Sequence, residues 1–303
     1  MACLKPTQPY EAITLIYAEL FLQGLVQGSI YALIALGLTL VYGLLRILHV
    51  AHAALFTLGA YIGVLVSNAS GSLTLALLCA MLTVGLLGML MYRWAYRPLL
   101  QHPPYVALIA SIGLYIAAEE LFRLVFGPYG LSYQAPPLQT VITLGNSGII
   151  LTQAELAVMI GSLLALLVLH ILATRTLLGL AWRATVTDPQ MAESFGINIQ
   201  QVRYINFFIG SALAAAAGVM VALLNNLVEP GMGSVPSYKA LAIIVLGGLG
   251  NVRGALLAAL TLGVIEAFGT IYLDAWLDRD AIAFAFLILV LMWRPHGLLG
   301  KAG

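Results

Sequence analysis

Long apolar runs recur along almost the whole chain, and they limit what it can fold into. Of the 303 residues, 62% are hydrophobic and only 8% are charged, whereas a soluble domain carries about 25% charged residues. A soluble fold of this size cannot hide so much apolar surface. Within hydrocarbon only helices and closed barrels pair all their backbone groups. Because the runs are continuous and do not alternate with polar residues as barrel strands do, the sequence predicts an all-α, polytopic membrane protein.

Nine runs are candidate transmembrane helices, since a span needs about 20 mostly apolar residues. They cover Glu19–Val41, Ala53–Val66, Leu73–Tyr92, Tyr105–Val125, Leu156–Ala173, Tyr204–Leu224, Lys239–Leu249, Ala255–Leu273 and Ala281–Trp293. The second and the seventh are short, so each fits a full span, a broken helix or a re-entrant segment. We therefore expect eight or nine transmembrane helices, with residues 1–18 as an N-terminal segment and residues 19–303 as a single transmembrane domain.

The charged residues between the runs predict the orientation, because cytoplasmic loops are enriched in Lys and Arg. Arg side chains follow the third and fifth runs and the last run, which predicts a cytoplasmic C-terminus. The loop 126–154 has no charged residue and is expected outside, as is the mostly acidic stretch Asp274–Asp280. Nine crossings would put the N-terminus outside and eight would put it inside, and the sequence leaves both open.

The predicted cytoplasmic loop 174–203 contains signals for a short helix. Asp188 is a favourable N-cap, Pro189 suits the first helical position, and Gly196 is a good stop. We expect a helix of about two turns, as judged from 3.6 residues per turn. Such a helix is either a docking element for a partner or an ordinary connector, and composition alone favours the connector.

Polar residues inside the apolar runs are candidates for a translocation path, because ionisable groups are costly in a bilayer. Gln27 and Tyr31 lie four residues apart on one helical face, where they line a path or bond a neighbouring helix. His52 either lines a path or caps a helix end. Glu266 has no local cationic partner, so Lys239 or Arg253 is the expected one unless it stays protonated or faces water. His49 and His52 lie three residues apart, but two histidines without a nearby carboxylate do not predict a metal site.

A glycine-rich stretch, residues 247–254, interrupts the apolar pattern near the seventh run. Broken helices in transporters expose backbone groups to solutes, which makes Gly248, Gly250 and Asn251 further candidates for the path. The alternative is close packing of helices, which small residues permit.

Many segments of the sequence resemble permease subunits of branched-chain amino acid ABC importers, and most closely the first of their two paired permeases. The resemblance lies in Gly28–Gly37, Val41–Gly43, Ala51–Ala53, Leu58–Tyr61, Arg183–Ala184, Met191–Ala192, Gly196–Asn198, Ala216–Gly218, Lys239–Ala240, Leu246–Asn251, Gly254 and Gly263–Glu266. Residues 192–197 resemble, in permuted form, the loop that docks such permeases into their ATPase. By that resemblance, the docking residues are Asp188, Met191, Ala192, Glu193, Phe195 and Gly196.

The resemblance implies a permease subunit of an ATP-driven importer in the bacterial inner membrane, moving branched-chain or related amino acids. The chain has no G-x-x-x-x-G-K-[ST] phosphate loop, so we expect no enzymatic activity and no cofactor in it. ATP and Mg²⁺ would be used by two partner ATP-binding subunits. The other expected partners are a second homologous permease, an external solute-binding protein and membrane lipid. Nucleic acid is not an expected partner, because the chain has no block of basic residues. The alternatives are import of urea or short amides, or a stand-alone secondary transporter.

Overall fold

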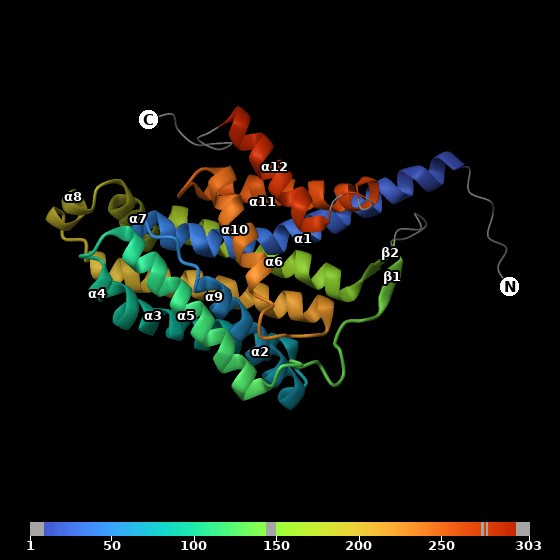
Figure 1. Cartoon of the computed structure of the whole chain (residues 1–303), viewed down its shortest axis with the longest axis horizontal. Coiled ribbons are helices and arrows are strands. Elements are labelled where there is room, and N and C mark those ends of the chain that lie inside the picture. Colours follow the sequence, from blue (N-terminus) through green and yellow to red (C-terminus); the bar gives the residue numbers. More distant parts are fainter. Residues whose placement is uncertain (1–8, 144–149, 274–275, 277, 295–303) are drawn as a thin grey trace.

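The computed structural model describes residues 9–143, 150–273, 276 and 278–294, and most of these are helical (Figure 1). Seven helical segments in this part of the chain are long and apolar enough to cross a membrane. They are formed by α1 (Pro9–Leu45), α2 (His52–Ser70), α3 (Leu73–Met91) with its continuations η1 (Tyr92–Tyr96) and α4 (Arg97–Leu99), α5 (Pro104–Phe126), α6 (Gln153–Arg175), α9 (Ile199–Asn225) and α11 (Val252–Tyr272). The prediction of a polytopic helical protein is confirmed.

The predicted count of eight or nine spans is not confirmed, because two helices are short. Helices α10 (Ser234–Gly247) and α12 (Arg279–Trp293) have 14 and 15 residues. At 1.5 Å per residue they reach only about 21 and 22 Å, against a hydrocarbon core of about 30 Å. The other short run, Ala53–Val66, lies within the 19-residue helix α2, which is long and apolar enough to span a membrane.

Helices α1 and α9 form the centre of the bundle. Helix α1 packs against α11, α9, α10 and α6, and α9 also packs against α2 and α3. Small residues allow the closest of these approaches. A Cβ built on Gly28 of α1 would lie 2.9 Å from the Cα of Leu260, and one built on Gly263 of α11 would meet the backbone of Gly28. Such contacts replace the hydrophobic effect as the packing force between helices in lipid.

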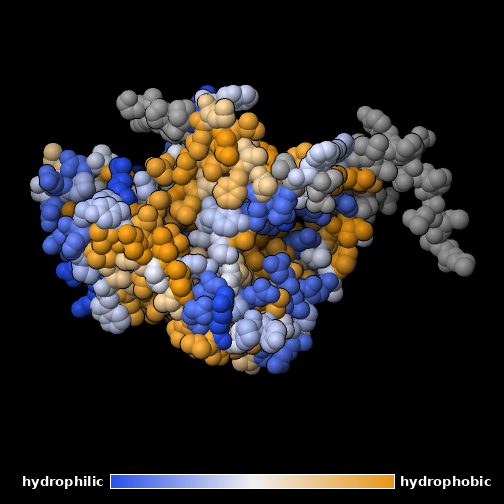
Figure 2. All heavy atoms as spheres, viewed as in Figure 1, coloured by the Kyte–Doolittle hydropathy of each residue, from blue (hydrophilic) through white to orange (hydrophobic). Residues whose placement is uncertain are grey.

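The outer helices present apolar side chains away from the bundle. Leu82 of α3, Ile109 of α5 and Leu163 of α6 are exposed although large and hydrophobic. Figure 2 shows hydrophobic residues over the middle of one face, with hydrophilic residues gathered at its left edge and in its right half. An apolar belt between polar ends is the surface expected of a protein surrounded by lipid.

The two ends of the bundle carry different structures. At one end, hereafter the hairpin end, strands β1 (Val141–Thr143) and β2 (Ile150–Thr152) pair antiparallel. The opposite end, hereafter the α8 end, carries α7 (Leu177–Thr187) and α8 (Pro189–Ser194) (Figure 1). The Ile150 N–H donates to a carboxylate oxygen of Glu19 at 3.1 Å, so α1 begins at the hairpin end. The small hairpin was not predicted from the sequence.

Candidate functional site

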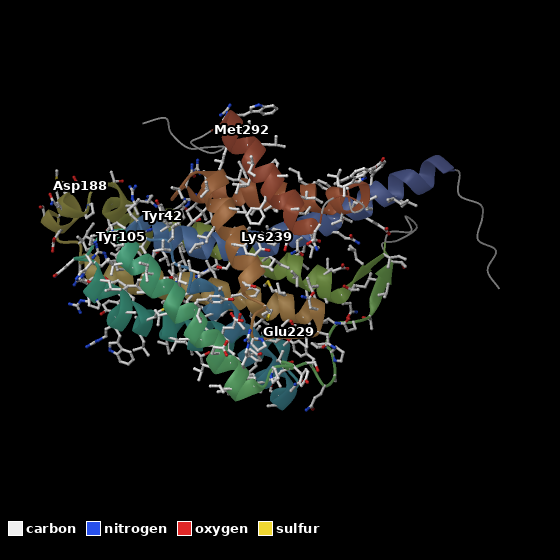
Figure 3. The ribbon with its side chains drawn as sticks, in the orientation of Figure 1. Tyr42, Tyr105, Asp188, Glu229, Lys239 and Met292 are labelled. Atoms are coloured by element: carbon white, nitrogen blue, oxygen red, sulfur yellow. The ribbon has the colours of Figure 1, made fainter. Side chains whose placement is uncertain are left out.

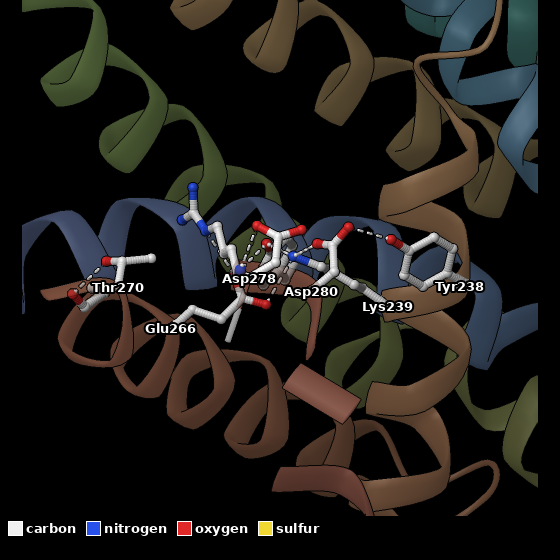
Figure 4. Close-up of polar contacts among 9 residues, drawn as sticks. Tyr238, Lys239, Glu266, Thr270, Asp278 and Asp280 are labelled. Carbon is white, nitrogen blue, oxygen red and sulfur yellow. Dashed lines mark hydrogen bonds and ion pairs between the residues drawn. The ribbon is translucent and has the colours of Figure 1, made fainter. Parts of the chain in front are cut away.

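Four charged side chains from three helices meet inside the bundle (Figure 4). Lys239 of α10 places its Nζ 2.9 Å from Oε1 of Glu266 in α11 and 2.9 Å from Oδ1 of Asp280 in α12. Arg279, also in α12, places its Nε 3.1 Å from Oε2 of Glu266. The side chains of Glu266 and Lys239 are 0% and 3% exposed. Two cations thus balance two carboxylates. The pairing matters most for the buried Lys239 and Glu266, where an unpaired charge would be strongly unfavourable.

Two tyrosines complete the hydrogen bonding of this ionic cluster. The Tyr31 hydroxyl of α1 donates to Oε2 of Glu266 at 2.7 Å and accepts from Nζ of Lys239 at 3.1 Å. The Tyr238 hydroxyl donates to Oδ2 of Asp280 at 2.6 Å. Helices α1, α10, α11 and α12 are therefore tied together through one network, which uses Tyr31 from one end of the chain and Asp280 from the other.

A cavity of about 410 Å³ lies next to this cluster, on the side toward the hairpin end, and Tyr31, Lys239, Arg279 and Asp280 border both. Its polar lining is Gln27, Tyr31, Asn225, Glu229, Lys239, Arg279 and Asp280. Its apolar lining is Ile30, Val221, Leu227, Met232, Val235 and Pro236. The connection between α9 and α10 forms part of the wall, and Val228 in that connection pairs with Leu131 of the loop before the hairpin. The site thus combines opposite charges with an aliphatic surface.

A second cavity, of about 400 Å³, lies nearer the α8 end between α1, α6, α7 and α11. Apolar side chains such as Leu166 and Trp182 make up most of its wall, and Arg183, Arg253 and Gly250 also line it. Arg253 was one of two expected partners for Glu266, but the structure pairs Glu266 with Lys239 and Arg279 instead.

The structure distributes the predicted path residues over several places. Gln27 and Tyr31 line the cavity next to the ionic cluster. Glu266 does not line it but accepts a hydrogen bond from Tyr31, which does. Gly250 lines the second cavity. His52 lines neither cavity and is buried in the first turn of α2 against Gly37 of α1. For these residues a role in translocation stays a prediction.

The remaining two path candidates, Gly248 and Asn251, shape the turn between α10 and α11 together with Gly250. Gly248 and Gly250 have φ angles of +95° and +80°, which favour glycine because other residues are strained there. Asn251 caps α11, since its side-chain oxygen accepts from the N–H groups of Arg253 and Gly254 at 3.1 and 3.2 Å. These contacts give the glycine-rich stretch a structural role, and its contact with solute stays a prediction.

Arg279 and Asp280 were not predicted as site residues. The sequence placed them in an external acidic stretch, but they lie in the first turn of α12 and pair with Lys239 and Glu266 in the ionic cluster. Residues 274, 275 and 277 of that stretch lie outside the described residues. The available signal was an adjacent cation and carboxylate at the very start of an apolar run.

Helix α8 begins as the sequence predicts. Oδ1 of Asp188 accepts from the Met191 N–H at 3.0 Å, and Gly196 follows the helix with a φ of +84°. With six residues, α8 makes about 1.7 turns, close to the expected two. Ala192 is buried, whereas Met191, Glu193 and Phe195 are exposed, Phe195 by 80%. Figure 3 shows Asp188 at the left end of the molecule, away from Lys239 and Glu229, so the exposed loop lies far from the cavity that these two residues line.

These features define a multi-pass helical membrane protein with a polar cavity facing one end and a protruding helical loop at the other. Comparison with known proteins supplies the family. The model for the branched-chain amino acid transport system permease component matches residues 20–292. The chain belongs to this family.

Curated relatives cover nearly the full chain. It is 34% identical over 300 residues to the high-affinity branched-chain amino acid transport system permease protein BraD of Pseudomonas aeruginosa, covering 94% of this chain and 96% of BraD. It is 32% identical over 300 residues to the corresponding permease protein LivH of Salmonella typhimurium, at 95% and 96% coverage. It is 26% identical over 308 residues to LivM of the same organism and the same system, at 89% and 68% coverage.

Among solved structures, PsaBC from Streptococcus pneumoniae in complex with Fab has a similar fold. The TM-score is 0.50 at 13% sequence identity, and the match covers 89% of this chain and 90% of that chain. At this identity the likeness concerns the fold alone.

Proposed function

We propose that this chain is a membrane-spanning permease subunit of an ATP-driven importer that moves branched-chain amino acids across the bacterial inner membrane. The family match over residues 20–292 carries this proposal. The cavity next to the ionic cluster supports the proposed solute, because aliphatic walls and opposite charges suit an aliphatic amino acid. Urea and short amides, the alternative solutes, carry no net-charged groups that would use Arg279 and Asp280.

The orientation we propose puts the hairpin end outside and the α8 end in the cytoplasm. The uncharged loop 126–154 and the Arg residues around α7 and α8 support it through the positive-inside rule. Helix α1 would then start outside, as any odd number of crossings that ends in a cytoplasmic C-terminus requires. The C-terminal residues 295–303, which the sequence predicts to be cytoplasmic, lie outside the described residues.

The partners follow from the same proposal. LivH and LivM are two permease proteins of one transport system in one organism, which supports a second homologous permease beside this chain. Two ATP-binding subunits would dock at the α8 end and use ATP and Mg²⁺ there. An external solute-binding protein would deliver solute to the cavity at the hairpin end. In this arrangement the chain itself holds no cofactor.

Reconstitution tests this division of labour. Liposomes containing this chain, the second permease, the ATP-binding subunits and the binding protein should take up radiolabelled leucine when ATP is inside. Liposomes containing this chain alone should take up none, because nothing in them converts ATP hydrolysis into movement. Uptake by the chain alone, unchanged by ATP, would identify a secondary transporter and contradict the proposal.

The exposed side of α8 offers the second test. Truncation of Phe195 to Ala should weaken binding of the ATP-binding subunits about 30-fold, because interface hot-spot side chains contribute about 2 kcal/mol or more. Glu193→Arg should also reduce ATPase activity coupled to transport. Both effects are measurable on purified complexes by subunit titration and phosphate release.

Trp94→Ala provides the matched control, since Trp94 is an aromatic residue with 71% exposure on η1, outside the loop 174–203. It should leave subunit binding and coupled ATPase activity at the level of the unmodified protein. Equal behaviour of the Phe195, Glu193 and Trp94 variants would remove α8 from the proposed docking surface.

A further inference from the structure

Arg279 and Lys239, the two cations of the ionic cluster, differ in how many of their N–H donors are hydrogen-bonded. The ammonium of Lys239 has three N–H donors, and the structure gives it three partners: Tyr31, Glu266 and Asp280. Arg279 uses only its Nε, which is held by Glu266. Among the described residues, its two terminal amino groups have no hydrogen-bond partner. Lys239 is therefore fully used within the protein, whereas Arg279 has donors left over.

The unused donors of Arg279 belong to a side chain that lines the cavity. Arg279 is 44% exposed even though its Nε contacts the fully buried Glu266. A guanidinium binds a carboxylate through two parallel N–H···O bonds, and this geometry is specific because the group is planar. Holding Nε fixes the plane of the guanidinium in advance. The buried Glu266 thus acts as a positioning residue for Arg279.

Asp280 supplies the opposite charge beside it. Its two oxygens accept from Lys239 and Tyr238, and an ionised carboxylate has about four acceptor positions, so further donors can bind. Its side chain is 34% exposed and lines the same cavity. Glu229 also lines the cavity, but Figure 3 places it well away from Lys239. An α-amino acid carries its ammonium and carboxylate on one carbon, which requires two protein charges close together.

We propose that Arg279 and Asp280 form a binding site for the zwitterion of an aliphatic amino acid on its way through the membrane. The Arg279 guanidinium binds the carboxylate, Asp280 accepts from the ammonium, and Ile30, Val221 and Val235 contact the aliphatic side chain. This inference rests on the proposed transport function. It adds that the permease itself recognises both charged groups of its solute.

A cysteine protection experiment on the whole importer in lipid nanodiscs tests the site. The chain has two cysteines, Cys3 and Cys79, which are replaced by Ser and Ala. Val235→Cys then puts one thiol into the cavity wall. Millimolar leucine should slow its reaction with a small maleimide. Leucinamide, which lacks the carboxylate, and 4-methylpentanoate, which lacks the ammonium, should protect far less.

In the same background, Arg279→Gln should weaken leucine protection about tenfold or more, since hydrogen bonds to charged groups contribute about 1.5–3 kcal/mol each. Arg279→Lys keeps the charge near Glu266 but loses the fork, so protection should also fall. Arg123→Gln is the matched control, because Arg123 is similarly exposed, at 49%, and pairs with carboxylates on the surface of α5. Leucine should protect the thiol in this control as strongly as in the Val235→Cys protein with no further change.

The outcomes separate the two proposals. Full leucine protection in both Arg279 variants would overturn the zwitterion site, as would equal protection by leucinamide. ATP-driven leucine uptake by the importer without substitutions would still support the transport function. If Arg279→Gln fails to assemble, as judged by size-exclusion chromatography, Arg279→Lys decides alone. Absence of leucine uptake by the importer without substitutions would instead contradict the proposed function itself.

Discussion

Lys239→Met should destabilise the protein by about 3–5 kcal/mol, the cost of removing one partner from a buried ion pair. The substitution leaves Glu266 and Asp280 facing only Arg279, in a place where Glu266 is fully buried. Methionine has a similar length, so the loss reports charge and not volume. Reversible unfolding of the purified chain in bicelles, followed by circular dichroism, measures the free energy of unfolding.

A second substitution separates charge balance from packing. Glu266→Gln in the Lys239→Met background restores neutrality, since Arg279 and Asp280 remain. The double variant should therefore be more stable than Lys239→Met alone, with a coupling energy of the sign expected for an attractive pair. A double variant whose destabilisation equals the sum of the two single effects would show that Lys239 and Glu266 do not interact.

Gly263→Ala should destabilise the protein by about 1–3 kcal/mol through overpacking. The added Cβ would meet backbone atoms of Gly24 and Gly28 in α1, and backbone cannot swing aside as a side chain can. Helices α1 and α11 must then separate, which also loosens the contact of Tyr31 with Glu266. The same unfolding assay measures the loss, and leucine uptake should fall with it.

Gly113→Ala is the matched control for this prediction. It makes the same chemical change in the membrane helix α5, where a Cβ would meet nothing within 4 Å. It should leave stability unchanged or slightly raise it, because alanine is the better helix former. Equal stability of the Gly263 and Gly113 variants would contradict the close packing of α1 on α11.

The helices could be predicted largely because membrane insertion is recorded in continuous apolar runs, but their ends could not. The run Ala53–Val66 stops where polar residues begin, yet α2 continues to Ser70. It continues because Asn68 bonds the backbone of Ser132 and Gln134, and Ser70 bonds the carbonyl of Val66. The hairpin escaped prediction because strands of three residues carry no readable periodicity.

The candidate site could be predicted only in part, because it is assembled from distant segments. Tyr31 and Glu266 were singled out as polar residues in apolar runs, and Lys239 was one of two expected partners. Their contact joins residues 235 positions apart in the chain, and it depends on how α1 packs against α11. Arg279 was missed because a charged residue at the start of a run looks like part of a loop.

The charge balance of the ionic cluster has an energetic consequence for transport. Moving one elementary charge across a membrane potential of 100 mV changes the free energy by about 2.3 kcal/mol. Lys239, Arg279, Glu266 and Asp280 together carry zero net charge, and so does an amino acid zwitterion. Passage of the zwitterion past a cluster that stays intact would therefore move no net charge through the electric field. Import should be electroneutral, so a depolarised cell would accumulate its amino acids as well as an energised one as long as ATP lasts.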